Sequence, residues 1–138
     1  MTPYVALFIA TLAPAVIVGM ARGGDGAIVA VIVLASFLGA HLSWRSPDPV
    51  LTNAMSDLAC AALIIVLCQA RWAMGVAVLF LVAVACSVAH EVRGMSAYVH
   101  VISAIGHMQN VATIIVGVEN GRRDRDAGRK IWALDYRN

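Results

Sequence analysis

The chain has 138 residues, of which 61% are hydrophobic and 13% are charged, and its formal net charge at pH 7 is +2. Soluble domains carry about a quarter charged residues, and a water-soluble fold of this size has no means of burying so much apolar surface. The composition therefore excludes a soluble globular domain and predicts an all-α fold, a polytopic membrane helix bundle.

The charged residues divide the chain into five apolar stretches. A spanning helix needs about 20 mostly apolar residues, and each stretch meets this length. We therefore expect five membrane spans, at residues 4–21, 27–44, 50–70, 73–91 and 96–118. Four spans with one re-entrant stretch are the alternative.

The segments between the expected spans carry turn and helix-boundary residues. "RGGDG" at 22–26 supplies glycines and charge for a tight turn. "RSPDP" at 45–49 supplies two prolines and an aspartate, which favours a helix start near Pro49. "QARW" at 69–72 is short, so the third and fourth spans should form an antiparallel hairpin. Pro14 lies inside the first span, where membrane helices tolerate proline.

Residues 119–138 are expected to form a hydrophilic tail after a transmembrane domain of residues 1–118. The tail holds six of the ten basic residues, and this excess favours the cytoplasmic side. We predict a cytoplasmic C-terminus and, with five spans, an N-terminus on the other side. Four acidic residues offset the basic ones, so no nucleic-acid partner is expected. The residues assigned to the membrane interface are Arg122, Arg123, Arg125, Arg129, Lys130, Trp132 and Tyr136.

Cysteines and motifs give no sign of an enzyme. Cys60, Cys68 and Cys86 all lie in apolar stretches, where we expect them to pack between helices as free thiols. The sequence contains no P-loop, GxGxxG or GxSxG motif. We expect neither catalysis nor a cofactor.

The last expected span carries a polar stripe. At 100° per residue, five polar side chains fall within roughly an 80° arc, while Gln109 points the opposite way. Such a stripe in a membrane helix faces the bundle interior or a water-filled path. The stripe consists of Ser96, His100, Ser103, His107 and Asn110.

The expected topology brings further polar residues to the membrane face where this stripe begins. Asp57 and His100 start from two different loops on that face and reach a similar depth of about 10–12 Å, so we predict that they touch. The whole predicted intramembrane cluster consists of His41, Asn53, Asp57, His90, Glu91, His100, Ser103, His107 and Asn110.

Three roles are open for this cluster. Interhelical hydrogen bonds hold membrane helices together without any further function. A carboxylate beside imidazoles carries protons or binds a transition metal. Two histidines on different spans are also able to ligate haem. The spacing of these residues leaves the metal undetermined, because no HxxxH or HExxH pattern occurs.

The arrangement of the whole chain is similar to that of small bacteriophage membrane proteins, holins in particular. The chain is short, consists almost entirely of spans with tight turns, and ends in a basic tail. This resemblance implies a non-enzymatic protein that accumulates in the bacterial inner membrane, forms homo-oligomers and opens a lesion for lysis. The polar stripe would then line the lesion or stay masked in the resting bundle. The alternative is an accessory subunit of a membrane complex, or a small proton or metal transporter.

Overall fold

The computed structural model describes residues 3–43, 45–94 and 97–135, apart from the side chains of 3–8, Arg22, Asp124 and 127–135. This part of the chain is helical, with no strand. The helices are α1 (Pro3–Arg22), α2 (Gly24–Ser43), α3 (Pro49–Leu67), α4 (Arg71–Arg93) and α5 (Tyr98–Asp135). The all-α bundle predicted from the sequence is confirmed.

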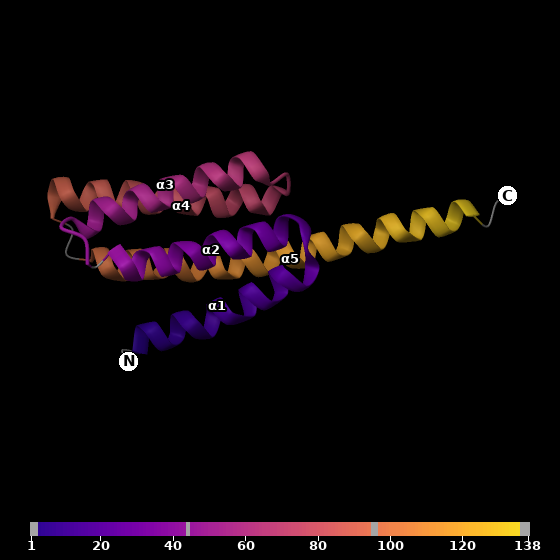
Figure 1. Cartoon of the computed structure of the whole chain (residues 1–138), viewed down its shortest axis with the longest axis horizontal. Coiled ribbons are helices and arrows are strands. Elements are labelled where there is room, and N and C mark those ends of the chain that lie inside the picture. Colours follow the sequence, from indigo (N-terminus) through magenta and orange to yellow (C-terminus); the bar gives the residue numbers. More distant parts are fainter. Residues whose placement is uncertain (1–2, 44, 95–96, 136–138) are drawn as a thin grey trace.

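Four helices form the body of the molecule, and the first helix lies against its side. α2, α3, α4 and α5 pack in a ring. Among the described residues, α1 packs against α2 and α5 and against no other helix. Successive helices run in opposite directions (Figure 1). α1 therefore begins at the end of the bundle where α2 ends, and α5 leaves the bundle at the opposite end.

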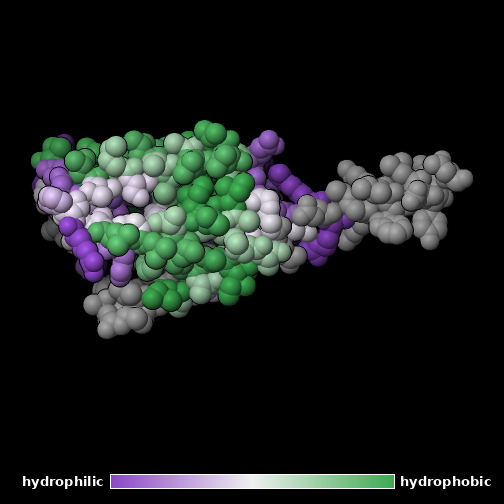
Figure 2. All heavy atoms as spheres, viewed as in Figure 1, coloured by the Kyte–Doolittle hydropathy of each residue, from purple (hydrophilic) through white to green (hydrophobic). Residues whose placement is uncertain are grey.

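The outer surface of the bundle is apolar. α2, α3, α4 and the Tyr98–Arg123 part of α5 are each long and apolar enough to cross a membrane. Figure 2 shows a broad hydrophobic belt on the viewed face, with hydrophilic residues at both ends of the bundle. Outward side chains such as Val66, which is 79% exposed, belong in lipid. The chain is thus a multi-pass integral membrane protein.

α1 is long enough to cross a membrane, but the apolar part of it that the structure describes is shorter than a membrane span. The helix has 20 residues, and its described apolar part is Ile9–Ala21. Five crossings of the membrane therefore stay a prediction, and four crossings stay the alternative.

The helix boundaries follow from the turn residues. Asp48 caps α3, because its side chain accepts a hydrogen bond of 2.9 Å from the Leu51 amide, and Pro49 occupies the first turn. The helix start predicted near Pro49 is confirmed. α4 ends at Arg93 and is followed by Gly94, which caps the helix in the left-handed conformation that glycine tolerates best.

The last helix is longer than the last predicted span. The predicted span ends at residue 118, and α5 continues past it to Asp135 as one helix of 38 residues that projects beyond the bundle (Figure 1). Interactions one turn apart support this part, including a 3.0 Å ion pair between Glu119 and Arg123. The onset of charge marks where the helix leaves the apolar belt, and the helix itself continues to Asp135.

Three helices meet closely at the end from which α5 projects. A Cβ atom added at Gly26 of α2 would lie 3.0 Å from the Cα atom of Gly117 of α5. A Cβ atom added at Gly19 of α1 would lie 2.6 Å from the carbonyl oxygen of Gly26. We call Gly19, Gly26 and Gly117 the glycine junction. Their small size lets α1, α2 and α5 approach within backbone contact.

Candidate functional site: a buried carboxylate below a cavity

Asp57 is the most unusual group in the bundle. It lies in α3 two turns from the helix start and is only 5% exposed. Ser36 Oγ of α2 donates to Oδ1 at 3.3 Å, and Asn53 Nδ2 donates to Oδ2 at 3.4 Å. Both distances are long for hydrogen bonds to a carboxylate. The ion pair found within the described residues joins Glu119 and Arg123 and does not include Asp57. The hydrogen bonds to the Asp57 carboxylate therefore come from neutral donors.

A cavity of about 220 Å³ lies next to this carboxylate, at the end of the bundle where α2 joins α3. In the described residues α3 and α5 do not pack directly against each other, and the cavity occupies the space between them. Asn53 lines the cavity and also donates to Asp57, so it separates the two by one side chain. The lining residues are Ala40, Ser43, Pro49, Val50, Asn53, Tyr98, Val99, Ile102 and Ser103.

The predicted contact between Asp57 and His100 is not among the hydrogen bonds that Asp57 makes in the described residues. Both residues lie toward the expected end of the bundle, but His100 is exposed on α5 whereas Asp57 is buried. The exposure of His100 differs from the predicted contact with Asp57. Ser36, which the sequence analysis did not include, is the residue from another helix that bonds Asp57.

The other members of the predicted cluster near this end are divided between several environments. His41 is exposed and its ring lies 5.5 Å from that of Phe37. His90 is stacked on Tyr98 with the ring centroids 4.3 Å apart. Glu91, the next residue of α4, is exposed. These three side chains therefore do not form a single site with Asp57.

The deeper part of the polar stripe faces α1. Asn110 is completely buried, and its Nδ2 atom donates to Thr11 Oγ1 of α1 at 2.9 Å. His107 Nδ1 lies 3.2 Å from the same Thr11 oxygen. Ser103, one turn nearer the start of α5, lines the cavity, and Ser96 lies outside the described residues. The stripe is thus divided: Asn110 and His107 contact α1, and Ser103 lines the cavity.

Two features of this region could not be predicted from the sequence. Gln109, on the opposite side of α5 from the stripe, is also buried, at 7% exposure. α5 is covered on several sides because it packs against α1, α2 and α4. Thr11 is the one serine or threonine in the sequence of α1, so no periodic pattern marks it as the partner of the stripe.

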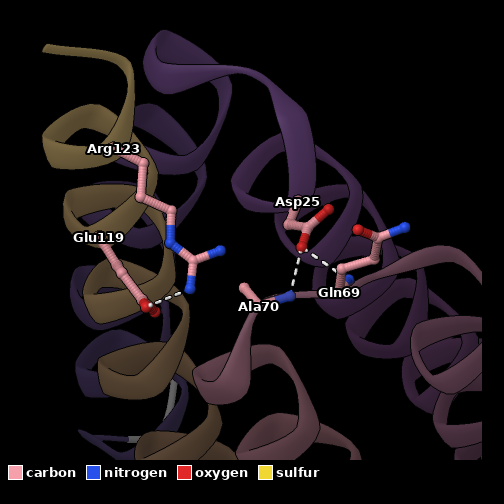
Figure 3. Close-up of polar contacts among 5 residues, drawn as sticks. All are labelled: Asp25, Gln69, Ala70, Glu119 and Arg123. Carbon is pink, nitrogen blue, oxygen red and sulfur yellow. Dashed lines mark hydrogen bonds and ion pairs between the residues drawn. The ribbon is translucent and has the colours of Figure 1, made fainter. Parts of the chain in front are cut away.

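At the opposite end of the bundle, Asp25 bonds the turn before α4, an arrangement that we call the Asp25 lock (Figure 3). The Glu119–Arg123 ion pair lies at the same end, where α5 leaves the bundle. Asp25 Oδ2 accepts hydrogen bonds from the backbone amides of Gln69 and Ala70, at 2.8 and 2.6 Å. This carboxylate ties the start of α2 to the turn before α4. Of the predicted interface residues, Arg122, Arg123 and Arg125 are exposed. The side chains of Arg129, Lys130 and Trp132, and the whole of Tyr136, lie outside the described part.

The possible metal ligands are dispersed. In the described residues, no three His, Cys, Asp or Glu side chains gather in a way that would hold a metal ion. Cys60, Cys68 and Cys86 are free thiols, as expected. The comparisons with known proteins found no matching family model, no matching curated protein and no matching solved structure. Any inference about the function of this protein therefore rests on the geometry of the Asp57 site.

Proposed function

We propose that this protein is a small membrane transporter in which Asp57 is the proton-binding carboxylate. The observation that carries the proposal is a carboxyl group, 5% exposed within a membrane helix, whose described partners are neutral. An ionised aspartate at the centre of a membrane helix costs about 2.5–3.5 kcal/mol on insertion scales. A bound proton removes this cost, and intramembrane carboxylates commonly serve proton relays.

The cavity supplies a route to this carboxylate from one end of the bundle. Asn53 stands between the cavity and Asp57, and its long hydrogen bond is easily exchanged for one to water. On the other side, Ser36 connects Asp57 to α2. With the predicted cytoplasmic C-terminus, the cavity faces the non-cytoplasmic side of the bacterial inner membrane.

Proton flux into proteoliposomes tests this proposal. Wild-type protein should acidify vesicles that contain a pH-sensitive dye when a membrane potential drives protons inward. Asp57→Asn keeps the hydrogen-bonding shape but removes the titrating group, so flux should fall to that of protein-free vesicles. Asp48→Asn is the matched control, because it makes the same chemical change on an exposed residue and asparagine caps a helix equally well. Equal flux in wild type and Asp57→Asn would overturn the proposal.

A holin-type function in lysis is the second proposal, and the arrangement of α5 favours it. Its polar side chains Asn110 and His107 are covered by α1, the helix that lies outside the four-helix ring. Separation of α1 from this face in a homo-oligomer would leave polar side chains to line a lesion. Expression in a bacterium should then abruptly permeabilise the inner membrane and release a co-expressed endolysin. Steady growth with a high level of inserted protein would contradict this function.

A further inference from the structure

The cavity beside Asp57 is large enough for a small organic molecule. An apolar cavity of about 150 Å³ binds benzene, and this one measures about 220 Å³. It therefore has room for one aromatic ring with a compact substituent. Most of its wall is aliphatic, with Ala40, Val50, Val99 and Ile102 among the lining residues. Such a wall favours an apolar ligand body.

The carboxylate behind the cavity wall favours a ligand that carries a positive charge. No basic side chain is found among the lining residues, and the Asp57 carboxylate lies behind Asn53, which lines the cavity. The Asp57 carboxylate lacks a cationic partner in the described part of the chain. Displacing the 3.4 Å hydrogen bond from Asn53 opens Oδ2 to a ligand. A cation in the cavity would supply the missing counter-charge.

An aromatic wall adds a second preference for a cation. Tyr98 lines the cavity. One face of its ring stacks on His90, and its hydroxyl lies 2.9 Å from Ser87 Oγ, so these contacts hold the ring in place and leave the other face for a ligand. Aromatic rings attract quaternary and protonated amines by their electron-rich faces. A bare metal ion is less suited to this site, because the cavity offers one amide, two serine hydroxyls and otherwise apolar atoms besides the tyrosine.

We propose that this cavity binds a small lipophilic organic cation, an aromatic ring carrying a quaternary or protonated ammonium group, with Asp57 as its counter-ion. The inference rests on the proposed function, because the same carboxylate would hold either a proton or the organic cation. Binding of the cation to protonated Asp57 would release that proton.

Phenyltrimethylammonium and its neutral carbon isostere tert-butylbenzene provide a direct test. Wild-type protein in detergent should bind radiolabelled phenyltrimethylammonium saturably, and excess tert-butylbenzene should compete poorly. Asp57→Asn should abolish the binding, and the matched control Asp48→Asn should retain it. Tyr98→Leu should weaken the binding about 3- to 30-fold, the range expected for loss of a cation–π contact. Equal competition by the neutral isostere would overturn the proposal even if a variant fails to fold.

The outcomes separate this inference from the proposed function. Proton flux that requires Asp57, combined with no saturable binding of phenyltrimethylammonium to the wild type, would overturn the cation site and leave the proton function intact. Saturable binding that requires Asp57, without proton flux, would support the cation site and overturn proton transport. Binding that persists in Asp57→Asn would show that the carboxylate is not the counter-ion and would overturn the inference.

Discussion

Gly19→Ala tests the close approach of α1 to the bundle. The added methyl group would lie 2.6 Å from Ala30 Cβ and 2.6 Å from the Gly26 carbonyl oxygen. Because one of these atoms belongs to the backbone, α1 must move away from α2. Overpacking of this kind costs about 1–3 kcal/mol. The opposing gain in helix propensity is at most about 1 kcal/mol, and it is smaller in a membrane, where the separated helix stays helical. We expect a net loss of about 1–2 kcal/mol.

The free energy of unfolding measured by titration with a denaturing detergent provides the readout. Gly75→Ala is the matched control, since it makes the same change inside α4, where the nearest atom to the new methyl group is Trp72 Cε3 at 4.0 Å. Gly75→Ala should leave stability unchanged or slightly increased. If Gly19→Ala is as stable as Gly75→Ala, the helices are not packed as closely as the glycine junction requires, and the reasoning fails.

Three further predictions concern the lock, the α1 contact and the topology. Asp25→Ala removes both hydrogen bonds to the amides of Gln69 and Ala70, and should cost about 1.5–3 kcal/mol with faster hydrogen exchange at these two amides; unchanged exchange would contradict the lock. Thr11→Val removes the acceptor of Asn110 Nδ2 and should destabilise the protein by about 0.6–1.7 kcal/mol in the same detergent titration; wild-type stability would show that the contact contributes nothing. Reporter fusions at the two ends of the chain should report opposite faces of the membrane, and agreement would indicate four crossings.

The positions of the helices could be predicted because hydropathy and turn chemistry act locally. The charged and glycine-rich segments separate the spans, and Pro49 starts α3 where a helix tolerates proline. The full length of α5 was not predicted, for a related reason. Hydropathy detects where a chain leaves the lipid, but a helix that reaches water continues until its sequence breaks it.

The hydrogen-bond partners of the polar residues could be predicted less well than the positions of the helices. In a soluble protein, apolar side chains mark the inner face of a helix. In a membrane the lipid is as apolar as the core, so this signal is lost. The stripe on α5 correctly indicated that Asn110 is buried. The same stripe gave no means of knowing that His100 would be exposed or that Ser36, rather than His100, would bond Asp57.

The unbroken length of α5 gives the molecule a mechanical property. At about 1.5 Å per residue, a helix of 38 residues is a rod of nearly 60 Å, and it has no proline at which to bend. The same rod presents Ser103 to the cavity and Asn110 to α1. A partner that grips the projecting end and turns it would rotate both side chains together, so torque applied outside the membrane reaches the polar groups within it.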